Sequence, residues 1–273
     1  GGTPSIFSVQ SIKQLLEGVL KRFVYDENIE ITLEANPGTV EAGKFEGFQH
    51  GGVSRLSIGI QSFENDKLIK LGRIHDSDEA AVAAKLAKNS GVASFNLDLM
   101  HGLPDQITRS ALSDLERAIK LSPDHISWYQ LTIEPNTAFY SKPPVLPADD
   151  ELWEIQQQGA EMLRKAGYAQ YEISAYSKKG FQCQHNKNYW RFGDYLGIGC
   201  GAHGKITDTE KQQIFRTVKV KHPKGYLDDN RAPLDQLITV PKEELVFEYM
   251  MNRLRMKESF STEDFEQRTG ISW

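Results

Sequence analysis

Four polar residues stand at or just beyond the ends of apolar, strand-like runs in the first half of the sequence. Glu34 ends the first run, Gln61 ends the second, and Asp98 lies in the third, while Arg73 follows in the loop after the second run. The carboxyl ends of parallel strands form the ligand site in α/β proteins, so we expect these side chains to share one mouth. Carboxylates suit ammonium and hydroxyl groups, and a guanidinium suits a carboxylate. Together they describe a ligand in which an amino acid is joined to a ribose.

The fourth apolar run carries further polar residues at its end, namely Gln130, Thr132 and Glu134. The alternative interpretation is that such residues only cap the sheet and meet water. For a single position that alternative is the better one. Four runs with polar ends in register favour a ligand site.

A second group of chemically capable residues lies between positions 183 and 204. Cys183, His185, Cys200 and His203 have the ligand types of a zinc site, but a single residue between the first Cys and His is an unusual spacing. The stretch 199–204 also matches GxGxxG, yet the residues after it have the pattern of a β-hairpin instead of the helix that a dinucleotide site requires. We therefore expect neither a zinc centre nor a dinucleotide fingerprint here.

The periodicity of apolar residues predicts the elements that position these side chains. Strands are predicted near residues 29–35, 53–60, 92–100, 125–133 and 168–174, and helices over 8–23, 40–50, 76–90, 109–121 and 149–166, with Ser8 as an N-cap. This alternation indicates βα units and a parallel sheet, either open and doubly wound or a partial barrel. A hairpin of 202–207 and 214–220 and two helices over 241–256 and 262–269 follow.

The composition is that of an ordinary globular protein, with 39% hydrophobic and 25% charged residues among 273. The formal net charge of −5 argues against nucleic acid as a partner. No apolar run has the length of a membrane span, and no signal-peptide pattern is present. Two cysteines are too few for a disulfide scaffold, so we expect a cytoplasmic location. The abrupt first and last residues lead us to expect an internal piece of a longer protein.

Several motifs, in order over essentially the whole chain, resemble the HemW/HemN branch of radical S-adenosylmethionine (SAM) proteins. They are GGTPS at residues 1–5, EANPGT at 34–39, SIGIQSF at 57–63, LGRIH at 71–75, NLDLMHGLP at 96–104, WYQLTIEPNT at 128–137 and HNKNYW at 185–190. The resemblance implies an α/β fold, a partial (βα)6 radical SAM barrel without its N-terminal strand and cluster loop, followed by a small α+β C-terminal region. We expect the barrel over 1–205, a hairpin and linker over 206–240, and the start of a small helical domain over 241–273.

The resemblance also implies a SAM site formed by Gly1, Gly2, Thr3, Glu34, Gln61, Arg73, Asp98 and Ala202. Gly1 and Gly2 match an element that presents backbone groups to the SAM amino group, with Glu34 nearby. Arg73 matches the partner of the SAM carboxylate, and Gln61 and Asp98 match the partners of the ribose hydroxyls. The glycines around Ala202 would let the backbone approach the adenine.

The iron–sulfur cluster of the family is the part that this sequence does not provide. The family holds a [4Fe–4S] cluster with a CxxxCxxC loop upstream of GGTP, and no such motif occurs here. Cys183 and Cys200 lie far from that position and cannot supply three thiolates. We therefore expect no metal ligands in this chain and no reductive cleavage of SAM by the chain as given.

The segment HNKNYW matches a motif of the family whose histidine is implicated in haem binding. His185, Tyr189 and Trp190 are therefore haem candidates, because haem needs an imidazole ligand and flat apolar walls. The alternative is that His185 only caps a helix.

The resemblance leaves two functions open. The first is a haem chaperone that binds haem and SAM and delivers haem to respiratory proteins, with a peripheral membrane contact as a further expectation. The second is an oxygen-independent coproporphyrinogen III dehydrogenase, for which the ligand is a porphyrinogen. The HNxxYW motif and the wording of GGTPS and EANPGT favour the first.

Overall fold

The structure is a computed structural model and describes residues 3–273. Its packing divides the chain into two compact units, with the boundary after Gln182. Each unit is described by itself. The domain limits expected at residues 205 and 240 stay predictions.

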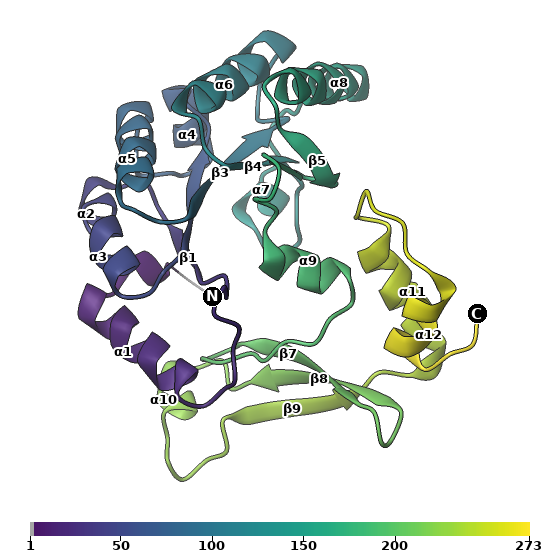
Figure 1. The fold of residues 1–273 in the computed structure, drawn as a ribbon. Coiled ribbons are helices and arrows are strands. Elements are labelled where there is room, and N and C mark those ends of the chain that lie inside the picture. The colour runs from purple at the N-terminus through teal and green to yellow at the C-terminus, as the bar shows by residue number, and fades with distance from the viewer. Residues whose placement is uncertain (1–2) are drawn as a thin grey trace. The chain divides into compact units, whose positions relative to one another are not determined.

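The first unit is built on a six-stranded mixed sheet with the strand order β1-β2-β3-β4-β6-β5 (Figure 1). The first four strands of that order are parallel, and β6 pairs antiparallel with both β4 and β5. The strands are β1 (Thr32–Ala35), β2 (Arg55–Gln61), β3 (Ser94–His101), β4 (His125–Gln130), β5 (Ala169–Glu172) and β6 (Ala175–Ser177). The predicted α/β fold is confirmed.

Helices cover the outer face of this sheet (Figure 1). They are α1 (Val9–Leu20), α2 (Thr39–Ala42), α3 (Phe45–His50), α4 (Asn65–Lys70), α5 (Ser77–Asn89), α6 (Thr108–Leu121) and α8 (Asp149–Lys165). The unit also contains the 3-10 helix η1 (Pro4–Ile6), which contacts β1, and the short helix α7 (Ala138–Ser141), which has no buried residue. Their starts follow capping chemistry: Ser8 accepts a hydrogen bond from the Ser11 N–H, and Asp76 forms a capping box with Glu79.

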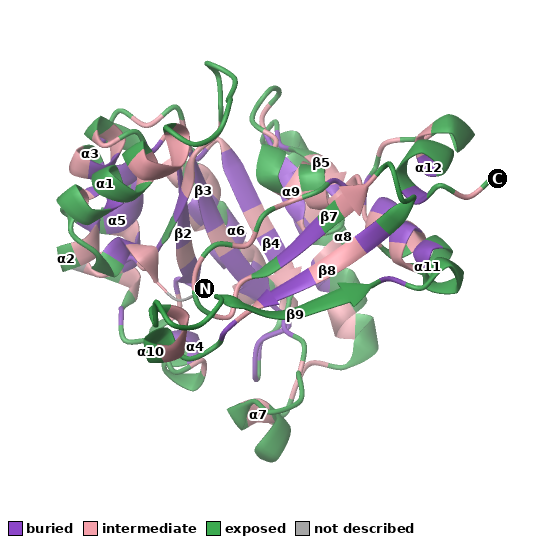
Figure 2. Cartoon of the chain, turned by 90° about the horizontal axis from the view of Figure 1, so that it is seen from below, coloured by how far each residue is buried: buried purple, intermediate pink, exposed green. Residues whose placement is uncertain are grey.

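Side chains alternate across the central strands, so one face of the sheet is apolar and the other polar. The apolar face packs against the helices and forms the core of the unit. Figure 2 shows the buried residues of the central strands in purple. Strand side chains in this core include Leu56, Ile58, Ile60, Leu97, Leu99, Ile126 and Trp128. The helices contribute phenylalanines from α3 and the alanine face of α5. The opposite face is left with the polar residues of the same strands.

Two predictions about this unit are wrong in detail. The fifth predicted strand is not parallel, because β5 turns back through Glu172 to Ala175 and places β6 next to β4. The helix predicted over 40–50 is interrupted, and α2 and α3 are separated by Gly43 and Lys44. Glycine in a helix interior costs about 1 kcal/mol relative to alanine, which favours a break there.

The second unit combines a three-stranded antiparallel sheet with helices. Its elements are α9 (Gln184–Trp190), β7 (His203–Asp208), β8 (Gln213–Lys219), α10 (Pro223–Tyr226), β9 (Leu234–Thr239), α11 (Lys242–Arg253) and α12 (Thr262–Thr269). The predicted hairpin and the two C-terminal helices are confirmed. The third strand β9 was not predicted. It is exposed along its length (Figure 2), so its side chains lack the apolar alternation that marks a half-buried strand.

The core of the second unit is aromatic. Tyr249 on α11 is fully buried and makes edge-to-face contacts with Phe192, Phe260 and Phe265. Such contacts add about 0.5–1.5 kcal/mol per pair beyond area burial.

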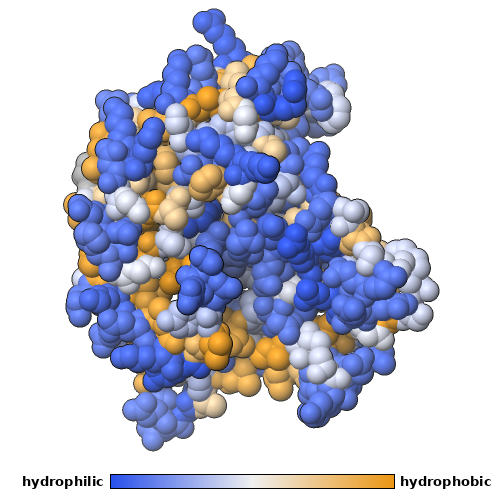
Figure 3. Space-filling view, viewed as in Figure 1, coloured by the Kyte–Doolittle hydropathy of each residue, from blue (hydrophilic) through white to orange (hydrophobic). Residues whose placement is uncertain are grey.

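On the surface, the face of the molecule in Figure 3 carries mainly hydrophilic side chains, as the composition indicates.

Candidate functional site

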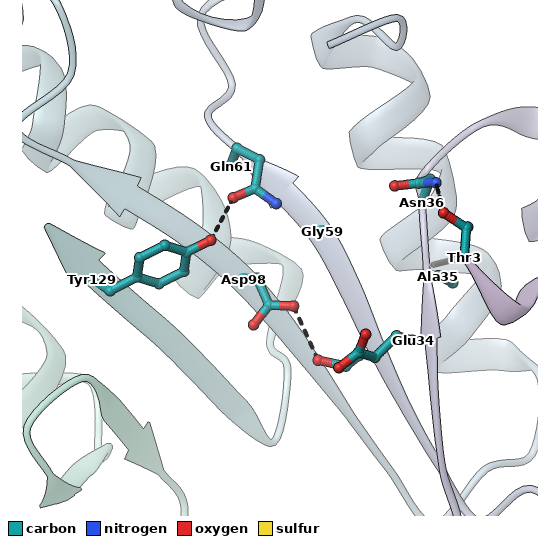
Figure 4. Close-up of a pocket in the computed structure, with 9 residues that line it drawn as sticks. Thr3, Glu34, Ala35, Asn36, Gly59, Gln61, Asp98 and Tyr129 are labelled. Carbon is teal, nitrogen blue, oxygen red and sulfur yellow. Dashed lines mark hydrogen bonds between the residues drawn. The ribbon is translucent and has the colours of Figure 1, made fainter. Parts of the chain in front are cut away.

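A polar pocket of about 300 Å³ opens at the carboxyl ends of the parallel strands in the first unit (Figure 4). It is lined by Thr3, Glu34, Ala35, Asn36, Ser57, Gly59, Gln61, Asp98 and Tyr129. Figure 4 shows Glu34, Gln61, Asp98 and Tyr129 pointing into the same space from four neighbouring strands. The expected convergence at one mouth is therefore present for Glu34, Gln61 and Asp98 but not for Arg73, and Thr3, which the resemblance placed in the SAM site, lines the same pocket.

Strand alternation explains why these residues meet. Ser57, Gly59 and Gln61 occupy every second position of β2 and leave the apolar face to the residues between them. Asp98 on β3 pairs in register with Ser127 of β4, so Tyr129 comes next on the same face. Alternate residues of each strand point to opposite faces of the sheet. Once the apolar residues face the core, the residues between them must face the pocket.

Gln61 takes an irregular backbone conformation that directs its side chain into the pocket. Its φ is 69°, and the pairing of β2 with β3 shifts register between Ile58 and Gln61. A left-handed backbone is costly for a residue other than glycine, so the surrounding structure must hold it. Gly59 leaves room for the side chain, because a Cβ there would lie 2.9 Å from Gln61 Nε2.

The turn after Gln61 is held from α6 by a buried carboxyl group. Asp114 accepts hydrogen bonds from Ser62 Oγ at 2.6 Å and from the Phe63 backbone N–H at 2.7 Å. Arg117 donates to the Phe63 carbonyl at 2.8 Å. Burial raises the pKa of Asp114 to about 6, and its two hydrogen bonds oppose that rise.

Tyr129 supplies a hydroxyl group that fixes the Gln61 amide. Its O–H donates to Gln61 Oε1 at 2.9 Å, and this leaves the Gln61 NH₂ group as a donor. Burial raises the pKa of Tyr129 to about 12, the Asp98 charge adds to the rise and the Arg73 charge opposes it. The phenol therefore stays protonated at neutral pH, and the pocket offers a fixed pattern of donors and acceptors.

The donor set fits a ligand that carries hydroxyl and ammonium groups. Two carboxylates, Glu34 and Asp98, accept hydrogen bonds. The Gln61 NH₂ group donates, and Asn36, whose Nδ2 donates to Thr3 Oγ1, offers its oxygen as an acceptor. An adenosyl amino acid such as SAM presents both of these groups. The residues present in the pocket fit that cofactor.

Other expected SAM residues fall elsewhere or stay untested. Arg73 is exposed in the loop after α4 and does not line the pocket, although its charge acts on Tyr129. Gly1 and Gly2 lie outside the described residues. Ala202 belongs to the second unit, just before β7, and its role stays a prediction.

The sequence also missed part of the pocket. Gln130, Thr132 and Glu134 do not line it, and Tyr129 does so in place of Gln130. Ser57, Asn36 and Tyr129 were not singled out. The signal was available for Ser57, which stands two residues before Gly59 and four before Gln61 on the same face of β2.

The haem candidates lie on α9 in the second unit. His185 is exposed, and its ring centroid lies 4.5 Å from that of Tyr189. Tyr189 and Trp190 line a pocket of about 250 Å³, together with Phe192, Gly193, Tyr195, Lys205, Arg216 and Asn252. The aromatic walls expected from the sequence are therefore next to one another, and their role stays a prediction.

The cysteine-containing stretch, residues 183–204, leads into a strand of the second unit. Cys183 is buried and Cys200 exposed. Residues 199–204 lead into β7, a strand, as expected from the hairpin pattern. Two cysteines do not fit the three thiolates of a [4Fe–4S] cluster, so no chemical step is assigned to a cluster in this chain.

None of the helices described within residues 3–273 combines the length and the apolar character needed to cross a membrane.

Comparison with known families matches both ends of the chain. The Radical SAM superfamily profile covers residues 1–115, and the HemN C-terminal domain profile covers residues 240–273. Among solved structures, coproporphyrinogen III oxidase (HemN) from Escherichia coli, a radical SAM enzyme, superposes with a TM-score of 0.81 at 21% identity. That match covers 99% of this chain and 65% of HemN, and at this identity it supports the fold alone.

Curated relatives are much more similar in sequence. Heme chaperone HemW of Haemophilus influenzae is 59% identical over 272 residues, which are 100% of this chain and 70% of that protein. Heme chaperone HemW of Escherichia coli is 55% identical over 99% of this chain and 71% of its own length. HemW of Bacillus subtilis is 33% identical over 100% of this chain and 72% of its own length. The chain thus spans about 70% of these relatives, and it belongs to the HemW family of radical SAM proteins.

Proposed function

We propose that the polar pocket of the first unit is the SAM site of a haem chaperone. Asp98 and Gln61 would bind the ribose hydroxyls, and Glu34 would accept hydrogen bonds from the ammonium group. Thr3 and Asn36, joined by a hydrogen bond of 3.3 Å, form the adjoining wall. Together with a reduced iron–sulfur cluster, SAM would supply radical chemistry. The residues of the chain itself bind and orient the cofactor.

We further propose that the protein binds haem through His185 and passes it to haem-accepting respiratory proteins in the cytoplasm. The observation that carries the chaperone function is the 59% and 55% identity, over the whole chain, to two proteins named as haem chaperones. The exposed His185 imidazole beside Tyr189 supports the haem site, because an axial ligand must be accessible and haem packs against flat rings. In this proposal haem is the molecule that the protein carries, and it is not a resident cofactor.

Haem titration of a His185→Ala variant tests this site. The change removes the imidazole and should weaken haem binding at least tenfold, measured by Soret absorbance in the full-length protein. SAM affinity, measured in parallel by equilibrium dialysis, should change by less than twofold.

The matched control is His222→Ala. His222 is also an exposed histidine of the second unit, and its side chain makes no capping hydrogen bond at α10. This variant should bind haem like the wild type. Equal loss of haem and SAM binding in His185→Ala would mean that His185 is structural, and unchanged haem binding would remove it as a ligand.

The alternative function is oxidative decarboxylation of coproporphyrinogen III. The HemN fold is compatible with it. The two functions differ in turnover, since a chaperone returns haem unchanged and a dehydrogenase converts a porphyrinogen.

A further inference from the structure

A buried network of hydrogen bonds lies beneath Asp98 and Ser57 in the first unit. Its centre is Asn96 on β3, which is 1% exposed and does not line the pocket. Asn96 Nδ2 lies 2.7 Å from Ser57 Oγ and 2.8 Å from Asp98 Oδ1. Ser57 Oγ lies 3.0 Å from Asp98 Oδ2. Each oxygen of the Asp98 carboxylate therefore accepts a hydrogen bond, from Asn96 at Oδ1 and from Ser57 at Oδ2.

A backbone group fixes the direction of every bond in this network. The Ser127 N–H can only donate, and it lies 3.0 Å from Asn96 Oδ1. The oxygen of the Asn96 amide must therefore face Ser127, and the NH₂ group must face Ser57 and Asp98. Ser57 Oγ then accepts from Asn96 and donates its own proton to Asp98.

His125 completes the network on the far side. His125 Nδ1 lies 2.7 Å from Asn96 Oδ1, which can only accept, so Nδ1 carries the proton. Burial lowers the pKa of His125 well below its usual value, and the Arg55 charge lowers it further. The neutral ring then accepts at Nε2 from the Tyr171 hydroxyl at 2.7 Å. One tautomer of His125 and one orientation of Asn96 satisfy all of these contacts.

We propose that Asn96 is a positioning residue that holds the Asp98 carboxylate so that its remaining lone pairs accept the ribose hydroxyls of the bound nucleoside. A carboxylate can only accept hydrogen bonds. The bonds from Asn96 and Ser57 use one lone pair on each oxygen of Asp98 and leave the others for a donor in the pocket. A ligand hydroxyl is a donor that satisfies it, and a deoxyribose leaves it without a partner. The inference rests on the proposed SAM site and adds to it the residue that gives the site its selectivity for ribose.

The ratio of the dissociation constants of 2′-deoxy-SAM and 3′-deoxy-SAM to that of SAM measures this selectivity. A hydrogen bond to a charged group contributes about 1.5–3 kcal/mol, which corresponds to about tenfold or more in affinity. The wild-type full-length protein, reconstituted with its cluster, should therefore bind at least one deoxy analogue about tenfold more weakly than SAM in equilibrium dialysis.

Asn96→Asp keeps the acceptor toward Ser127 and His125 but replaces the donor toward Ser57 and Asp98 by a carboxylate oxygen. The selectivity ratio should fall by about threefold or more, since the Gln61 contact remains. In the Asp98→Ala background the same change should have no further effect on the ratio, because a residue that acts through Asp98 has nothing left to position. A ratio that falls again in that background would overturn the proposal.

Two substitutions at His125 keep the test decisive if Asn96→Asp does not fold. His125→Asn retains a donor near the Nδ1 position and should preserve selectivity, whereas His125→Gln places its donor near Nε2 and should lower the ratio several-fold. Equal ratios in the two variants would contradict the proposal. A wild-type protein that binds SAM without selectivity would overturn the positioning role alone, and a wild-type protein that does not bind SAM would overturn the proposed function with it.

Discussion

Asp114 illustrates how a buried carboxyl group can serve a site that it does not touch. It holds Ser62 and Phe63, and so supports the left-handed backbone of Gln61 just before them. The cost is the burial of an ionisable group that is 1% exposed. The pKa of Asp114, raised to about 6, measures that cost.

This shift predicts a pH dependence of stability. The folded pKa of about 6 lies above the unfolded value of 3.8, so the folded state holds its proton more tightly. The contribution of Asp114 to the free energy of unfolding should therefore fall as pH rises from about 4 to 6, by about 3 kcal/mol in total. Asp114→Asn should lack this pH dependence, because the uncharged amide can accept from the Phe63 N–H through its oxygen and donate to Ser62 Oγ through its NH₂ group.

The measurement is urea unfolding of the wild type and the variant between pH 4 and pH 7. The free-energy difference between the two should move in favour of the variant as pH rises. A difference that stays constant across this range would show that the carboxyl group is not destabilised by burial.

At the residue scale, the sequence pointed to three residues of the pocket and missed Ser57, Asn36 and Tyr129. Glu34, Gln61 and Asp98 stand out because a polar residue is rare in an apolar strand. Serine and tyrosine occur on either face of a strand. Ser57 and Tyr129 can be assigned to the pocket face only by counting alternate positions from the neighbouring core residues. The orientation of Asn96 depends on a backbone N–H of another strand, which no local pattern encodes.

At the element scale, the contact of α8 with β4 depends on a glycine. A Cβ on Gly159 would lie 2.0 Å from Trp128 Cη2. Trp128 is 1% exposed and is packed between His101 and Tyr176, so its ring cannot move aside. Close approach of the helix to the sheet therefore requires glycine at this position.

Gly159→Ala should lower the free energy of unfolding by about 1–3 kcal/mol or more, because overpacking displaces the helix or the ring. Gly18→Ala in α1 is the matched control, since the nearest atom to its Cβ is Arg22 NH1 at 3.7 Å. That change should stabilise the protein by about 0.5–1 kcal/mol through helix propensity. Denaturant unfolding compares the two, and equal effects would contradict the packing argument.

The long helices α1, α5, α6 and α8 and the first four strands of the first unit were predictable because their apolar periodicity is regular. The short helices α4 and α7 have six and four residues, too few to show a helical period, and they were not predicted. The error at the fifth strand has a physical reason: β5 and β6 have only four and three residues, so periodicity cannot separate a hairpin from a single parallel strand. Their pairing is decided by the tertiary contact with β4.

For the whole molecule, the two candidate sites are built by different parts of the chain. Every residue of the polar pocket lies between Thr3 and Tyr129, and every residue of the aromatic pocket lies between Tyr189 and Asn252. The boundary after Gln182 separates them. A substitution among the residues that line one pocket therefore leaves the lining of the other pocket unchanged in sequence.

The most direct test of the chaperone function is turnover. The full-length protein, reconstituted anaerobically with its cluster, is incubated with SAM, a reductant and coproporphyrinogen III, and the products are separated by chromatography. In parallel, haem binding is followed by Soret absorbance. We expect haem to bind and to be recovered unchanged, with no protoporphyrinogen IX formed. Catalytic formation of protoporphyrinogen IX would contradict the account and identify a dehydrogenase.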